Sequence, residues 1–206
     1  MEHDADVPTS TPLDGWLAEL GQPNGAPGGG AASGVMLGIA ASLLRMVAEY
    51  TPNDPQAEEC GIRLAHTRAE VLEAVEADGV YSAAFGAALG RPADDPERDR
   101  RVQDAAMEAA QSSARLGDIG IRLLPEVRLL AEIGNPHLVA DLAVAVEALH
   151  AGMAGAIINL RSNLQIARKH GTPAAALRPL DDEKSRLVNA QREVAQLTEA
   201  LSSRLD

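Results

Sequence analysis

Five clusters of proline and glycine divide this sequence into segments whose apolar residues recur every three or four positions. The clusters lie at residues 21–30, 51–55, 90–92, 134–136 and 171–173. Proline and glycine end helices, and a spacing of three or four places apolar side chains on one helix face. No segment shows the strict alternation between turns that is typical of strands. The sequence therefore predicts an all-α fold, an up-and-down bundle of about five to six helices.

The expected helices cover about residues 12–20, 29–50, 55–89, 95–133, 136–169 and 181–203. Pro125 lies inside the fourth helix, where it removes one backbone hydrogen bond and is expected to cause a kink. The last helix carries apolar residues at heptad spacing, which pack either on the bundle or on a second copy of the chain. Residues 1–11 are polar and aperiodic, so we expect a loose tail followed by a single helical domain over residues 12–206.

The composition excludes several classes of protein. Apolar residues make up 46% of the 206 residues but aromatic residues only 2%, so helices packed closely through small side chains are expected. A net charge of −12 provides no basic surface for nucleic acid or anionic lipid. Cys60 is the only cysteine and the sequence shows no signal-peptide pattern, which indicates a cytoplasmic protein.

Two apolar stretches are interpreted as buried bundle helices, with no membrane partner. The stretch at residues 31–44 is shorter than the roughly 20 residues of a membrane span, and the stretch at 139–160 contains Asp141, Glu147 and His150.

The turn formed by Pro27, Gly28, Gly29 and Gly30 leads directly into the second expected helix. Free backbone N–H groups at such a helix start can bind an anion or a carbonyl oxygen. The turn is neither a P-loop nor a dinucleotide fingerprint, because the Lys-Ser/Thr pair and a preceding strand are absent. The alternative is that the glycines only permit a tight turn. Gly30, Gly34 and Gly38 also share one helix face, which favours close packing of a neighbouring backbone.

Asp78 shares a helix face with Tyr81, Ser82 and Phe85, at spacings of three, four and seven residues. This combination suits a flat heterocycle that donates a hydrogen bond to the carboxylate. The alternative is a solvated acid beside core aromatics.

The fifth expected helix offers Asn135, Asp141, Asn159 and Asn163 as polar candidates. Asn159 and Asn163 are four residues apart and can act together. Asp141 and Asn159 lie roughly 27 Å apart at about 1.5 Å per residue, so one helix cannot bring both into one small site. An antiparallel partner helix or a second subunit would have to do so. No histidine or cysteine spacing indicates a metal site.

Several segments in order resemble one family, the cyclodeaminase domain of formiminotransferase-cyclodeaminases together with the stand-alone methenyltetrahydrofolate cyclohydrolases. The segments are residues 27–34, 46–48, 76–81, 134–136, 141–142 and 155–164. The resemblance implies an all-helical homodimer that acts on a tetrahydrofolate carrying a one-carbon unit and needs no tightly bound cofactor. It implies Asp78 and Asp141 as catalytic residues. It implies substrate binding by Pro27, Gly28, Gly29, Gly30, Asn135, Asn159 and Asn163.

Two reactions are consistent with the resemblance. A cyclodeaminase closes formimino-tetrahydrofolate to the methenyl form with loss of ammonia, and a cyclohydrolase opens the methenyl bridge with water. A chain of this length holds no formiminotransferase half, so cyclohydrolase activity is expected ahead of cyclodeaminase activity.

The chain departs from the family pattern at Ala140, at Ser82 and at residues 49–54, where relatives carry a lysine-bearing stretch. A missing cation there would weaken attraction for the glutamate carboxylates of a folate, for which Arg45 or Arg161 can compensate. The departures support an alternative from another class, a non-catalytic helical dimerisation or interaction protein on the same scaffold. Stabilisation by an added folate would separate the two hypotheses.

Overall fold

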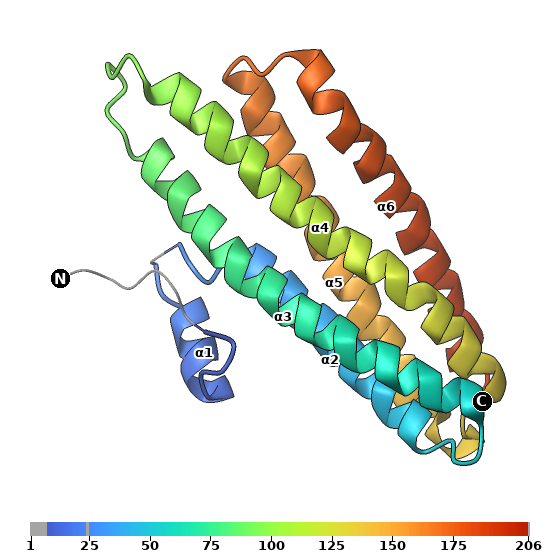
Figure 1. The fold of residues 1–206 in the computed structure, drawn as a ribbon. Helices are drawn as coiled ribbons and strands as arrows, with labels where there is room; N and C mark the ends of the chain where they lie inside the picture. Colours follow the sequence, from blue (N-terminus) through green and yellow to red (C-terminus); the bar gives the residue numbers. More distant parts are fainter. Residues whose placement is uncertain (1–7, 24, 206) are drawn as a thin grey trace.

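The computed structural model describes residues 8–23 and 25–205, and its helices form an up-and-down bundle (Figure 1). In chain order the elements are α1 (Leu13–Leu20), α2 (Gly29–Glu49), α3 (Pro55–Leu89), α4 (Arg98–Ile133), the short 3-10 helix η1 (Pro136–Leu138), α5 (Val139–Lys169) and α6 (Ala174–Ser202). The five long helices α2 to α6 run side by side, and α1 lies beside the bundle. The all-α bundle predicted from the sequence is confirmed.

The helix boundaries follow from local chemistry at the breakers. Asp54 caps α3, because its Oδ1 accepts hydrogen bonds from the backbone N–H groups of Gln56 (2.8 Å) and Ala57 (3.2 Å), and Pro55 occupies the first helical position. The connection before α5 is similar, since the Asn135 side chain accepts from the backbone N–H of His137.

The last helix begins earlier than the sequence indicated. We expected its start near residue 181, but α6 starts at Ala174 and continues through Pro179. Leu177 in this added stretch is buried, so packing outweighs the backbone hydrogen bond that Pro179 removes. The heptad residues Leu187, Val194 and Leu201 are buried within this one chain, so the seam packs on the bundle.

Pro125 lies within α4, which continues on both sides of it, and the expected kink stays a prediction. The expected tail falls partly on residues 1–7, which lie outside the described residues. Beyond them, Thr9 contacts α3: its backbone N–H and its Oγ1 donate to Glu76 Oε1, at 3.1 and 2.9 Å.

Small residues let the helices approach closely. A Cβ on Gly34 would lie 2.3 Å from Val75 Cγ2, and one on Gly117 would lie 2.5 Å from a Leu187 methyl carbon. Gly38 is less crowded, with Val71 at 3.7 Å. The packing role predicted for the glycine face of α2 is therefore confirmed at Gly34, where α2 meets α3.

Two helical stretches, Gly29–Glu49 and Pro136–Lys169, are long and apolar enough to cross a membrane, with mean hydropathies of 1.7 and 1.5. About half of each apolar window, 56% and 50%, is buried inside the bundle. Core helices of a bundle have this burial pattern.

α2 is 21 residues long, whereas α3, α4 and α5 have 31 to 36 residues. Because α2 is shorter, it begins beside the middle of its neighbours rather than at an end of the bundle (Figure 1). This difference in length places the glycine turn inside the span of the bundle.

Candidate functional site

The glycine turn meets α3 and α5 where α2 begins. Gly28 caps α2 without a side-chain hydrogen bond, so the first N–H groups of the helix depend on other elements for partners. Ala26 and Pro27 are buried, which anchors the turn. The positive end of the α2 dipole points out of this turn.

The Asp78 carboxylate on α3 lies directly against this helix start. A Cβ on Gly30 would lie only 2.2 Å from Asp78 Oδ2, so glycine is required for the carboxylate to be there. Asp78 is 4% exposed. It accepts hydrogen bonds from Ser112 Oγ on Oδ1 (2.9 Å), from Ser82 Oγ on Oδ2 (3.4 Å) and from the backbone N–H of Ala31. Within the described residues, no Lys, Arg or His forms an ion pair with it.

The Asp78 pKa is raised above its ordinary value. Burial disfavours the charged form, and this outweighs the hydrogen bonds from Ser112, Ser82 and the Ala31 backbone, which favour it. The result is a carboxyl group that can hold or release a proton and whose only partners are neutral donors.

Asn159 on α5 lies on the other side of the turn. Its amide oxygen and nitrogen would lie 3.5 and 3.6 Å from a Cβ on Gly29, and its Nδ2 donates to the Gly155 carbonyl at 3.0 Å. Its Oδ1 receives no hydrogen bond from any residue that the structure describes. Asn163, one turn further along α5, is partly exposed. The structure therefore groups the glycine turn, Asp78 and Asn159, with Asn163 one turn away.

Asn135 and Asp141 lie elsewhere, near the end of α2. Asn135 Nδ2 donates to the Tyr50 carbonyl (3.0 Å), its Oδ1 accepts from His137, and its backbone N–H donates to Thr51 Oγ1 (3.1 Å). These bonds join the connection between α2 and α3 to the connection between α4 and α5. Asp141 is partly exposed and forms no ion pair or side-chain hydrogen bond with the described residues. As the rise of a helix requires, Asp141 is about 27 Å from Asn159 in one subunit.

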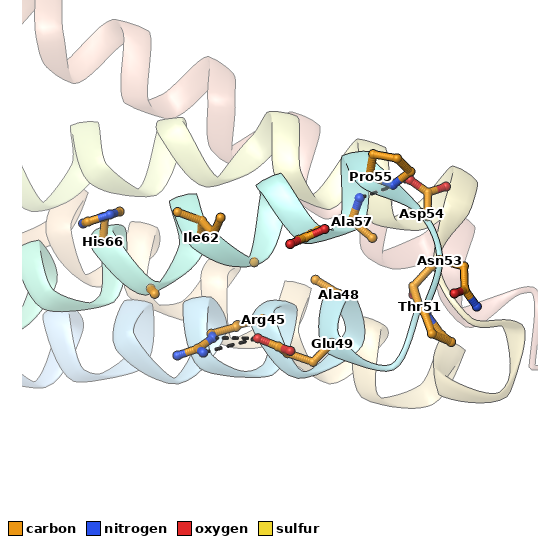
Figure 2. Close-up of a pocket in the computed structure, with 14 residues that line it drawn as sticks. Arg45, Ala48, Glu49, Thr51, Asn53, Asp54, Pro55, Ala57, Ile62 and His66 are labelled. Carbon is orange, nitrogen blue, oxygen red and sulfur yellow. Dashed lines mark hydrogen bonds and ion pairs between the residues drawn. The ribbon is translucent and has the colours of Figure 1, made fainter.

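A cleft of about 790 Å³ opens beside this second region, between the end of α2 and the start of α3 (Figure 2). Its lining includes Glu49, Thr51, Pro52, Asn53 and Asp54. Figure 2 shows Arg45 paired with Glu49, at 3.2 Å, along one wall. Arg45 thus already pairs with a carboxylate of its own helix.

Arg161 has a different setting. It lines a hollow of about 530 Å³ on α5 and α6 with Ser162, Arg168 and Lys184, and none of the lining residues is acidic. Arg168 and Lys184 both pair with Asp181, whereas Arg161 forms no ion pair with a described residue. Ser162 lies three residues from Asn159, so the hollow adjoins the glycine-turn group.

Sequence reasoning missed Ser112, which lies on α4 and hydrogen-bonds Asp78 from 34 residues away. The available signal was a pair of serines, Ser112 and Ser113, in an alanine-rich helical stretch. Of the residues that share the Asp78 face, Ser82 joins the group, whereas Tyr81 is 37% exposed.

Comparisons with known proteins point to one family. A family model described as Formiminotransferase-cyclodeaminase matches residues 12–172. Formimidoyltransferase-cyclodeaminase of Mus musculus is 31% identical over 166 residues, which is 75% of this chain and 31% of that protein. The Sus scrofa protein of the same name is 30% identical over 165 residues, 75% of this chain and 30% of its own. The chain thus spans about a third of the length of these curated relatives.

The fold has a solved counterpart. The crystal structure of formiminotetrahydrofolate cyclodeaminase from Thermotoga maritima matches with a TM-score of 0.77 and covers 94% of this chain and 98% of that one. The sequence identity is 21%, so this likeness concerns the arrangement of the helices.

Proposed function

The chain belongs to the formiminotransferase-cyclodeaminase family, and on that premise we propose that it is a folate one-carbon enzyme. It interconverts methenyl-tetrahydrofolate with formyl- or formimino-tetrahydrofolate. The observation that supports this proposal most is the buried Asp78 carboxylate, held by neutral donors alone against the glycine turn.

Both reactions take place at one amidine-like carbon, which carries positive charge in the methenyl form. A buried carboxylate without a cationic partner attracts such a carbon, because the charge–charge interaction is weakly screened there. In the hydrolytic direction water adds to that carbon and loses a proton. One carbon–nitrogen bond of the bridge then breaks as the hydroxyl becomes the formyl carbonyl and its proton passes to the released nitrogen. In the deaminating direction the secondary amine of the folate that does not carry the formimino group attacks the carbon and loses its proton, the formimino nitrogen gains a proton, and ammonia leaves.

Asp78 is proposed to accept and return the proton in both cases. General acid–base groups work best when their pKa lies closer to the working pH than that of an ordinary aspartate, and burial shifts the Asp78 pKa in that direction. The N–H groups of the turn and the free Oδ1 of Asn159 are proposed to orient the pterin-bearing part of the substrate, with Asn163 beside them.

We propose that Arg161, rather than Arg45, attracts the carboxylates of the substrate's glutamate. Arg161 lines a hollow that adjoins Asn159 through Ser162, while Arg45 is paired with Glu49 beside the other cleft.

Asp141 contributes to the proposed site only if a second subunit supplies it. α5 carries exposed small and apolar residues seven positions apart on an outward face, namely Val144, Ala151 and Ile158, with Ala148 and Gly155 at the edge where α5 packs on its own bundle. Val144 and Ile158 are 57% and 62% exposed. Such a seam suits the close packing of a second helix.

If two copies pack their α5 helices antiparallel about Ala151, a residue before it faces the residue equally far after it. Asp141, ten residues before Ala151, then lies level with residue 161 of the partner subunit, ten residues after it, and within one turn of the partner's Asn159 and Asn163. Asp141 would thus reach the region of Asn159 and Asn163 from the other chain. We therefore propose a homodimer with composite sites, a cytoplasmic enzyme that uses neither nucleic acid nor a membrane as a partner.

The decisive experiment is turnover by the purified protein. Methenyl-tetrahydrofolate and formimino-tetrahydrofolate are offered separately, and loss or gain of the methenyl absorbance is followed. Turnover of either supports the proposal and distinguishes cyclohydrolase from cyclodeaminase activity. No turnover of both, together with no shift in melting temperature on adding either folate, contradicts it.

The second candidate is a non-catalytic dimerisation protein on the same scaffold. The observation that favours it is the acid-bearing segment at residues 49–54, because Glu49, Asp54 and Glu58 line the larger cleft and would repel the carboxylates of a folate. A dimer that neither binds nor converts folates would support this candidate.

A further inference from the structure

Ser112 approaches Asp78 from a helix on which sequence analysis placed no functional residue. It lies on α4, is 7% exposed, and donates its hydroxyl to Asp78 Oδ1 at 2.9 Å. This is the shortest of the side-chain hydrogen bonds that the carboxylate receives, since Ser82 is 3.4 Å from Oδ2. A hydrogen bond to an ionised group inside a protein is among the stronger kinds.

The two carboxylate oxygens have different surroundings. Oδ1 is held by Ser112 at 2.9 Å, whereas Oδ2 has only the longer side-chain bond from Ser82, at 3.4 Å. Oδ2 also lies closer to the position that a Cβ on Gly30 would take, at 2.2 Å against 2.6 Å for Oδ1. Ser112 thus fixes the rotation of the carboxylate, so that one oxygen is tied to α4 and the other faces the start of α2.

We infer that Ser112 is a positioning residue for the proton transfer at Asp78, holding Oδ1 so that Oδ2 faces the glycine turn and remains the oxygen that exchanges the proton. The inference rests on the proposed function, because the transfer is the one proposed above. Its chemistry is simple: Ser112 keeps its own proton, and Oδ2 takes the proton released by the water or by the attacking nitrogen and later returns it.

The charged groups around Asp78 leave Ser112 as the main side-chain influence on its ionisation. On α3, Glu76 is bonded to Thr9, and Tyr81 is partly exposed. On α4, Glu108 and Arg115 line a small hollow with Tyr81 at the surface. The first turn of α2 and the neighbouring residues Gly155 and Asn159 of α5 carry no ionisable side chain. None of these acidic and basic groups forms an ion pair with Asp78.

Ser113 provides a matched control on the same helix. It is also buried, but its hydroxyl donates to the Ala109 carbonyl, 2.9 Å away within α4. Ser113→Ala therefore removes a buried hydroxyl without touching the carboxylate.

The test compares the full-length wild type with Ser112→Ala, Ser112→Cys and Ser113→Ala. The Asp78 carboxyl carbon is titrated by NMR, and the pH profile of kcat/KM is measured on the folate that the wild type turns over. In Ser112→Ala the NMR midpoint and the acid limb of the profile are expected about one pH unit higher, because a hydrogen bond to the charged form is lost. The kcat is expected to fall more than KM rises. Ser112→Cys, which has a similar size and a weaker donor, is expected to lie between, and Ser113→Ala to match the wild type.

The outcomes separate this inference from the proposed function. An Asp78 midpoint and an acid limb in Ser112→Ala that match the wild type, with wild-type turnover present, overturn the positioning role. Equal shifts in Ser112→Ala and Ser113→Ala also overturn it, because they indicate a general effect on α4. A wild type that turns over neither folate contradicts the proposed function instead, and the NMR titration then still reports whether Ser112 holds the carboxylate.

Discussion

The two ends of α2 each meet a polar side chain from a distant part of the chain. At its start, Asp78 accepts bonds from two serines and a backbone N–H and has no ion-pair partner among the described residues. At its end, Asn135 bonds the Tyr50 carbonyl and caps η1, so its amide is occupied on both sides. Both residues belong to the ordered motifs of the sequence. They differ in whether the side chain still has a group free to interact with a ligand. Both polar atoms of the Asn135 amide are already bonded, whereas the Asp78 carboxylate lacks a described ion-pair partner, so the start of α2 is the candidate site.

The largest expected effect of a single substitution is at Asp78. Asp78→Asn keeps the shape but removes the base, so kcat/KM should fall by at least about 100-fold, within the range usual for a lost general base. Far-ultraviolet circular dichroism checks that the helices remain. If the variant retained near-wild-type turnover, Asp78 would not be the residue that transfers the proton.

A mixture of two inactive variants tests whether the two regions meet across a dimer. Asp78→Asn and Asp141→Asn homodimers should each be weak, because every composite site lacks one carboxylate. Refolding an equal mixture gives mixed dimers in which one of the two sites is intact. Random pairing makes half of the dimers mixed, so activity should recover to about a quarter of the wild-type value. If the mixture is no more active than its components, Asp141 does not complete the site of a partner.

The close contact at Gly30 provides a structural test. Gly30→Ala would place a methyl group 2.2 Å from Asp78 Oδ2, so the carboxylate or α2 must move. We expect a loss of about 1–3 kcal/mol in unfolding free energy, together with lost activity. Gly38→Ala is the matched control, since its Cβ would lie 3.7 Å from Val71 and alanine favours a helix. Equal destabilisation of both variants in urea unfolding would mean that the contact with Asp78 is not the cause of the lost stability.

At the other end of α2, Asn135→Ala should cost stability rather than catalysis. It leaves the His137 N–H and the Tyr50 carbonyl without their partner, for a loss of about 1–2 kcal/mol in unfolding free energy. The kcat should change little, because the side chain is already committed to the two connections. A large fall in kcat with unchanged stability would place Asn135 in the site and remove the contrast between the two ends.

Much of the fold could be predicted because proline and glycine mark the helix ends directly. The start of α6 was missed since Pro179 and the preceding alanines resemble a linker, and only the burial of Leu177 makes that stretch a helix. Within the site, the separation of Asp141 from Asn159 follows from the rise of a helix. The contact of Asp78 with Gly30 and Ser112 does not, because it depends on the register of α3 against α2 and α4. No local pattern encodes that register.

The smallest expected effect is the pH dependence that Asp78 gives to stability. Burial raises its pKa in the folded protein, while the unfolded chain has the ordinary value of about 3.9. Below that pH the carboxyl is protonated in both states and makes no pH-dependent contribution to the unfolding free energy. As the pH rises from there through the folded pKa, the unfolded chain releases its proton first, so the unfolding free energy falls. Asp78→Asn cannot titrate, and the difference in unfolding free energy between wild type and variant should therefore decline from about pH 4 upward and then level off. Urea unfolding of both proteins across this range measures the decline, at about 1.4 kcal/mol for each unit by which the pKa is raised. A difference that grows with pH would mean that hydrogen bonds from Ser112, Ser82 and Ala31 outweigh burial, and the start of α2 would then stabilise the charge as an ordinary helix cap does.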